Sequence, residues 1–139
     1  MKGKVLVIED NEQNLYLVTF LLQSHGYDVI AARNGAEGIA SAKSGKPDLI
    51  LLDIQLPLMD GYTVAKALRD NPGLIETPII AVTSYAMTGD REKALLAGCN
   101  GYIEKPINPD TFMSQIEELL SLKKDAGGHN DTHSDGRRQ

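Results

Sequence analysis

The sequence has 139 residues, of which 42% are apolar and 24% charged, and its formal net charge at pH 7 is −5. This length and composition are typical of one soluble globular domain, and the acidic balance argues against nucleic acid or an anionic membrane as the main partner. No apolar run approaches the roughly 20 residues of a membrane span. No signal peptide is evident and Cys99 is the only cysteine, so a disulfide framework is excluded and a cytoplasmic location is expected.

The polar residues are unevenly distributed along the chain. Residues 123–139 contain four basic and three acidic side chains and almost nothing apolar. Such a segment cannot bury enough apolar surface to offset the entropy of ordering it. We therefore expect a folded domain over residues 3–122 and a disordered polar tail over residues 123–139.

The first strand is expected at residues 5–8, a continuous apolar run with β-branched side chains that is typical of a strand buried on both faces. After it, Leu15, Val18 and Leu22 recur at helical spacing, and Gly26 provides the end of that helix.

A second strand is expected at residues 29–32, followed by a helix that Asn34 caps and that ends before residues 45–47. The most apolar run of the chain, residues 49–52, predicts a third strand, which ends at Asp53.

A loop rich in turn residues, 56–61, leads to a third helix. Gly61 in this loop is expected to occupy a turn that needs a positive φ angle. The helix carries Val64 on its apolar face and is broken at residues 71–73.

The last third of the sequence continues the alternation. A strand is expected at residues 79–82, a helix at 89–97, a short strand at 101–103 that Pro106 closes, and a final helix that begins near Pro109. Five strands thus alternate with five helices through short connections. This order predicts a doubly wound, flavodoxin-like α/β fold, with a five-stranded parallel sheet between helices on both sides.

Polar side chains follow four of the expected strands, and the carboxyl ends of parallel strands share one edge of the sheet, where ligands bind. They are Glu9, Asp10, Asp53, Thr83 and Lys105. Taken singly, Asp10 could be a helix cap and Lys105 a solvated charge. Taken together, three carboxylates repel one another unless a cation compensates, and Mg²⁺ favours such oxygen ligands.

These positions, together with the loop 53–61, resemble the receiver domain of two-component response regulators, including chemotaxis-type receivers, over residues 3–122. The resemblance implies that Asp53 accepts a phosphoryl group from a histidine kinase or a histidine phosphotransfer protein. It also implies that Glu9, Asp10, Asp53 and the backbone carbonyl of Gln55 hold Mg²⁺, for which Mn²⁺ can substitute.

The same resemblance implies roles for residues around the acceptor. Lys105 and the Thr83 hydroxyl would bind phosphoryl oxygens, and the peptide bond between Lys105 and Pro106 would be cis. Thr83 and Tyr102 would form a switch pair whose side chains move on phosphorylation.

Two further residues would tune the lifetime of the phosphoryl group. They are Gln55, two positions after the acceptor, and Tyr85, two positions after Thr83. A tyrosine ring at position 85 would obstruct the attacking water, so self-dephosphorylation is expected to be slow.

The chain shows no output domain, so the signal is expected to leave by protein contact, at a surface formed by the helix at 89–97, the strand at 101–103 and the last helix. The resemblance implies a monomer or a weak, phosphorylation-dependent homodimer. A stand-alone, single-domain response regulator is expected, and a receiver taken from a hybrid kinase stays the alternative.

An enzyme on a similar fold is disfavoured by the residues themselves. An aspartate-nucleophile phosphatase would place a second aspartate at position 55, where this chain has Gln55. A flavodoxin-like electron carrier would need a phosphate-binding loop after the first strand, where this chain has Glu9 and Asp10. We therefore expect a phospho-acceptor signalling module rather than an enzyme.

Overall fold

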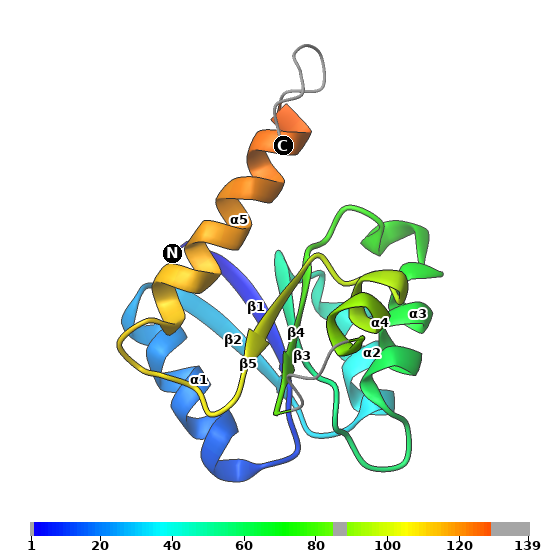
Figure 1. Ribbon diagram of the computed structural model, residues 1–139, viewed down its shortest axis with the longest axis horizontal. Coiled ribbons are helices and arrows are strands. Elements are labelled where there is room, and N and C mark those ends of the chain that lie inside the picture. The colour runs from blue at the N-terminus through cyan, green and yellow to red at the C-terminus, as the bar shows by residue number, and fades with distance from the viewer. Residues whose placement is uncertain (1, 85–88, 129–139) are drawn as a thin grey trace.

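A parallel β-sheet forms the centre of the protein (Figure 1). The computed structural model describes residues 2–84 and 89–128, with side chains up to residue 121. Within these residues, the strands lie in the order β2-β1-β3-β4-β5 and every neighbouring pair is parallel. The strands are β1 (Gly3–Ile8), β2 (Tyr27–Ala32), β3 (Leu49–Asp53), β4 (Ile79–Thr83) and β5 (Gly101–Glu104).

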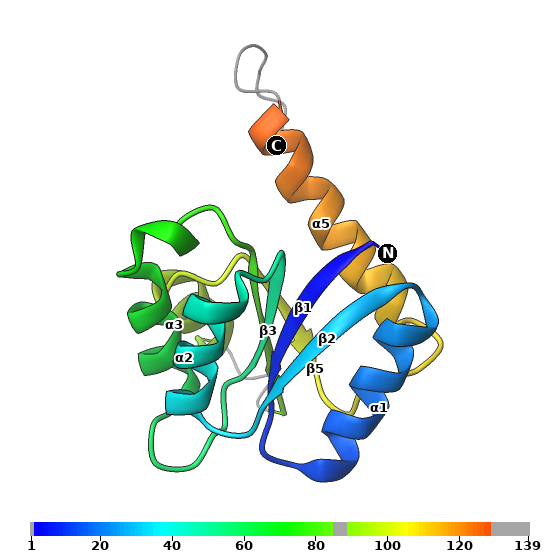
Figure 2. The same cartoon turned by 180° about the vertical axis from the view of Figure 1, so that it is seen from behind.

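Helices cover both faces of this sheet, as Figures 1 and 2 show from opposite sides. Helices α1 and α5 lie on one face, and α2, α3 and α4 lie on the other. The doubly wound α/β fold expected from the sequence is confirmed. The helices are α1 (Glu12–Ser24), α2 (Gly35–Gly45), α3 (Gly61–Arg69), α4 (Asp90–Leu96) and α5 (Phe112–Gly128), with a short 3₁₀ helix, η1 (Pro72–Leu74), after α3.

The central strands are apolar at successive positions because both of their faces are covered. All five residues of β3 are buried. In β1, Leu6 and Ile8 belong to the core beneath α2, α3 and α4, whereas Val5 and Val7 belong to the core beneath α1 and α5. Because successive side chains of a strand point to opposite faces of the sheet, this single apolar run contributes to both cores.

Side-chain caps begin three of the helices at the carboxyl-end edge of the sheet. Asn11 accepts a hydrogen bond from the N–H of Asn14 at 2.9 Å, and Asp60 accepts one from the N–H of Thr63 at 2.9 Å. Asn34 caps α2, as predicted, and its Oδ1 accepts from the N–H of Glu37 at 2.8 Å. These caps satisfy N–H groups that have no partner inside the helix.

The prediction that Gly61 has a positive φ angle is wrong, although the structure does require a glycine there. Positive φ angles among the described glycines occur at other positions. Gly61 is required instead by a close approach of two backbone segments, since its N–H donates to the carbonyl of Ile54 at 2.9 Å. A Cβ atom at position 61 would lie 2.5 Å from Ile54 Cα and 2.8 Å from the backbone oxygen of Asp53.

The last helix differs from its expected bounds. It begins at Phe112 rather than near Pro109, and it continues to Gly128. Residues 123–128, which were expected in the tail, therefore have helical backbone, while residues 129–139 lie outside the described part of the chain. None of the described helices is long and apolar enough to cross a membrane.

Arg69, at the end of α3, joins segments that lie far apart in the sequence. Its guanidinium group donates to the carbonyls of Gly98 at 2.9 Å and of Leu74 and Thr77 at 2.7 Å. It also donates to Asn100 Oδ1 at 2.7 Å. The planar group with its five N–H donors thus holds the connections before β4 and β5 against α3.

Leu58, in the loop between β3 and α3, combines strain with full exposure. Its φ angle is 68°, in the left-handed region, and its relative exposure is 103%. Because asparagine adopts this region more readily than leucine, Leu58→Asn is expected to raise the free energy of unfolding by about 0.5 to 1 kcal/mol. Urea titration measures the change. Leu96→Asn, at an exposed position of α4, is the matched control and should not raise stability, and a Leu58→Asn variant no more stable than the wild type would refute the prediction.

Candidate functional site

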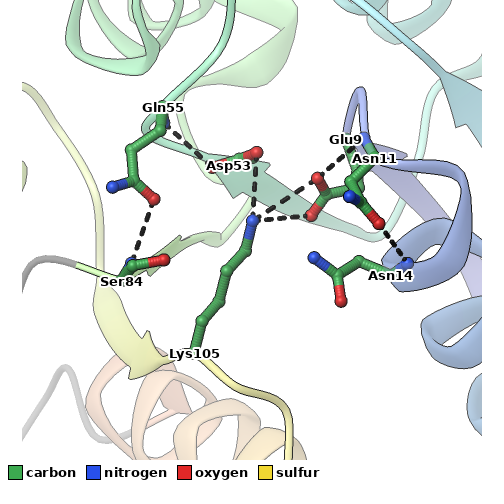
Figure 3. Close-up of polar contacts among 7 residues, drawn as sticks. All are labelled: Glu9, Asn11, Asn14, Asp53, Gln55, Ser84 and Lys105. Carbon is green, nitrogen blue, oxygen red and sulfur yellow. Dashed lines mark hydrogen bonds and ion pairs between the residues drawn. The ribbon is translucent and has the colours of Figure 1, made fainter.

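Three carboxylates meet at the carboxyl ends of β1 and β3 (Figure 3 shows two of them). Ligand oxygens of Glu9, Asp10 and Asp53 all lie within 4.8 Å of one another. Glu9 and Asp53 are 4% and 3% exposed, whereas Asp10 is exposed. Among the described side chains, no other group of three or more His, Cys, Asp or Glu residues could share a metal ion. The prediction that these carboxylates converge is confirmed.

Lys105 supplies a positive charge beside two of these carboxylates. Its Nζ atom lies 3.2 Å from Asp53 Oδ2 and 3.1 Å from Glu9 Oε1. Burial alone would lower the pKa of Lys105, but the attraction of Asp53 and Glu9 outweighs it, so the pKa of Lys105 is raised and the side chain stays charged. The peptide bond between Lys105 and Pro106 is cis.

Glu9 holds its proton far more tightly than an ordinary glutamate. Burial, with the nearby charge of Asp53 and a hydrogen bond to it, raises the pKa of Glu9 from 4.5 to about 7, although the N–H of Asn11 and the charge of Lys105 oppose the shift. The Asn11 N–H donates to Glu9 Oε2 at 3.1 Å. Burial and the charge of Asp53 thus outweigh the charge of Lys105 at Glu9, and a cation bound beside these carboxylates would lower the free energy of the cluster.

This shift predicts a pH dependence of stability in the metal-free protein. Because the folded protein binds the Glu9 proton more tightly than the unfolded chain, the stabilising contribution is present below about pH 4.5 and is lost as the pH rises through about 7. Relative to Glu9→Gln, the wild type should lose about 1 to 2 kcal/mol of unfolding free energy between about pH 6 and pH 8. Urea titrations with a chelator measure this, and parallel curves for the two proteins would contradict it.

Gln55 contacts both Asp53 and a neighbouring strand end. Its backbone N–H donates to Asp53 Oδ1 at 2.9 Å, and its side-chain Oε1 accepts from the Ser84 N–H at 3.0 Å (Figure 3). The sequence pointed to Gln55 but not to the contact with Ser84. No pattern in the sequence could have revealed it, because it joins two loops 29 positions apart.

Thr83 and Tyr102 occupy adjoining strands. Thr83 is 2% exposed at the end of β4, and its backbone oxygen accepts from the Lys105 N–H at 2.8 Å. Tyr102 is half-buried on β5 against the core beneath α2, α3 and α4, and burial raises the pKa of its hydroxyl. The switch role of this pair stays a prediction. Tyr85 lies outside the described residues.

The donor set of the cluster suits Mg²⁺ or Mn²⁺. The available ligands are carboxylate oxygens, with no sulfur or imidazole among them, and hard divalent cations prefer oxygen. Two of the three carboxylates are buried and only partly balanced by Lys105. The residues at this edge of the sheet therefore fit a divalent cation.

Comparison with known proteins decides the family. Residues 5–117 match the family model of the response regulator receiver domain. The chain belongs to this family. As a receiver domain, it is 44% identical over 120 residues to the polar-differentiation response regulator DivK of Brucella anthropi, with 86% of this chain and 98% of that protein covered. DivK of Brucella ovis is 43% identical over the same length.

Solved receiver structures agree with this assignment. The chemotaxis response regulator CheY4 of Vibrio cholerae superposes with a TM-score of 0.83 at 30% identity, covering 86% of this chain and 100% of that one. The receiver domain of the sensor histidine kinase PA1611 of Pseudomonas aeruginosa superposes with a TM-score of 0.79 at 33% identity, covering 87% and 99%. That structure contains a magnesium ion coordinated in its active-site cleft.

Proposed function

We propose that this receiver domain accepts a phosphoryl group on Asp53 from a histidine kinase or a histidine phosphotransfer protein. One observation carries the proposal. The Asp53 carboxylate is buried at the end of a central strand, held at both oxygens by the Gln55 N–H and the Lys105 ammonium group, and lies beside Glu9 and Asp10. A carboxylate fixed in this way is positioned as a nucleophile.

The chemistry is a single displacement at phosphorus. A carboxylate oxygen of Asp53 forms a bond to phosphorus, the bond from phosphorus to the donor's imidazole nitrogen breaks, and that nitrogen keeps the electron pair. The charge of Lys105 and the hydroxyl of Thr83 stabilise the phosphoryl oxygens as charge develops on them. Because Lys105 already lies 3.2 Å from Asp53, little reorganisation is needed.

Glu9, Asp10 and Asp53, with the backbone carbonyl of Gln55, would hold Mg²⁺ or Mn²⁺ at this site. When bound, the cation neutralises charge on the phosphoryl oxygens. The magnesium ion in the PA1611 receiver supports this proposal, as does the raised pKa of Glu9, which comes first from burial and then from the charge of Asp53, against the opposing charge of Lys105.

We also propose that the signal is passed on when a downstream protein binds the surface formed by α4, β5 and α5. This binding would take place in the cytoplasm. A cavity of about 690 Å³ lies there, and its lining includes Arg91, Tyr102, Lys105 and Thr111. Since Lys105 belongs both to the acceptor site and to this cavity, a phosphoryl group on Asp53 would alter the surface directly. The same surface would serve a weak, phosphorylation-dependent homodimer.

The test is phosphorylation by acetyl phosphate, with and without Mg²⁺, measured by intact-mass spectrometry. We expect one added phosphoryl group that requires the metal, and none in Asp53→Asn. Asp28→Asn, on the exposed face of the edge strand β2, is the matched control and should be modified like the wild type. An adduct that persists in Asp53→Asn, or its absence from a folded wild type with Mg²⁺, would refute the proposal.

A further inference from the structure

Gln55 links the end of β3, where Asp53 lies, to the end of β4. Asp53 ends β3 and Thr83 ends β4, and Gln55 and Ser84 follow them in the chain. The Gln55 backbone N–H donates to the acceptor carboxylate, while its side-chain oxygen accepts from the Ser84 N–H at 3.0 Å. Figure 3 shows the carboxamide reaching toward Ser84 on one side of Asp53, with Lys105 approaching from below.

This contact occupies a backbone donor beside the acceptor. The Ser84 N–H directly follows the buried Thr83, whose hydroxyl is proposed to bind a phosphoryl oxygen. Backbone N–H groups next to a reacting group are the donors that stabilise a developing oxyanion. An N–H has one proton, so Ser84 cannot donate fully to Gln55 and to a phosphoryl oxygen at the same time.

We propose that Gln55 is a positioning residue that holds the Ser84 N–H while Asp53 is unphosphorylated and releases it to a phosphoryl oxygen afterwards. The inference rests on the proposed function of Asp53. Through this exchange, Ser84 is tied to the loop after Asp53 before phosphorylation and to the phosphoryl group after it.

The direction of the exchange follows from hydrogen-bond strength. The Gln55–Ser84 contact joins two neutral groups, whereas a bond from an N–H to a phosphoryl oxygen is charge-assisted and about twice as strong. The exchange is therefore favourable. The cost of breaking the neutral contact reduces the affinity of the site for a phosphoryl group, and so removing the contact should increase that affinity.

The first test examines the contact in the unphosphorylated protein. Gln55→Met keeps the length of the side chain and removes the acceptor oxygen. Hydrogen exchange of the Ser84 amide, followed by NMR without phosphodonor, should become about two- to tenfold faster. Gln23→Met, an exposed position of α1, should leave it unchanged, and Gln55→Glu, which retains an acceptor oxygen, should preserve the protection. Equal exchange in Gln55→Met and wild type would overturn the proposal.

The second test uses beryllofluoride with Mg²⁺ as a phosphoryl mimic. Gln55→Met should bind it about two- to tenfold more tightly than wild type or Gln23→Met, because no contact to Ser84 has to break. Equal or weaker binding would overturn the proposal, and weaker binding would show that the carboxamide contacts the phosphoryl group itself. If the wild type binds no beryllofluoride, the proposed function fails, and this outcome is distinct because the exchange measurement does not involve phosphate.

Discussion

Lys105→Met is expected to slow phosphorylation of Asp53 by acetyl phosphate by about 10²–10³-fold. The ammonium group of Lys105 lies 3.2 Å from Asp53 and 3.1 Å from Glu9, and its side chain is only 11% exposed. A preorganised donor in a site shielded from water stabilises developing charge far more than an exposed one does. Intact-mass spectrometry over time, at saturating Mg²⁺, gives the rate.

Two further variants test whether the position of the positive charge and the shape of the group that carries it matter. Lys43→Met, on the exposed face of α2, removes the same charge away from the site and should leave the rate unchanged. Lys105→Arg keeps the charge, but a planar guanidinium group differs in shape and donor geometry from the compact ammonium group, so it should restore only part of the rate. A folded Lys105→Met protein that is phosphorylated within about twofold of the wild-type rate would contradict the assigned role.

Gly61→Ala is expected to lower the free energy of unfolding by about 1 to 3 kcal/mol. The added Cβ would lie 2.5 Å from Ile54 Cα and 2.8 Å from the backbone oxygen of Asp53. Both neighbours are backbone atoms that cannot rotate away, so the end of β3 has to shift. Urea titration measures the loss of stability.

The same substitution should also affect the proposed phosphorylation, because the strain falls on Asp53. A displaced Asp53 should be phosphorylated at least about tenfold more slowly in the fraction that remains folded. Gly73→Ala is the matched control, since a Cβ there would meet its nearest atom, Asn71 Oδ1, at 3.4 Å. Equal effects of the two substitutions on stability and on rate would show that the contact at Gly61 is not limiting.

Some predictions from the sequence were confirmed because they rest on local rules. The apolar runs of β1 and β3 identify buried parallel strands, and the position of Asn34 directly before a helix with one apolar face identifies a cap. The ends of helices were predicted less accurately than their presence. The last helix begins at Phe112 and not near Pro109, because the exact start depends on where the backbone packs rather than on the propensity of one residue.

The position of the carboxylate cluster could be predicted, because parallel strands bring their carboxyl ends to one edge of the sheet. That rule alone places Glu9, Asp10 and Asp53 together, and the structure does so within 4.8 Å. The sequence did not reveal how the charges are balanced. The pKa of Glu9 rises to about 7 mainly through burial, and burial is a property of the packed molecule.

By itself, the sequence determined the order of strands and helices, the parallel sheet and the edge at which the carboxylates gather, since these follow from apolar periodicity and chain connectivity. Only the tertiary structure decided that Gln55 contacts Ser84, that Arg69 joins α3 to Asn100, and that Gly61 is needed for a close backbone approach rather than for a positive φ. The physical reason is that each of these contacts joins groups distant along the chain, or excludes an atom from a space that exists only after packing.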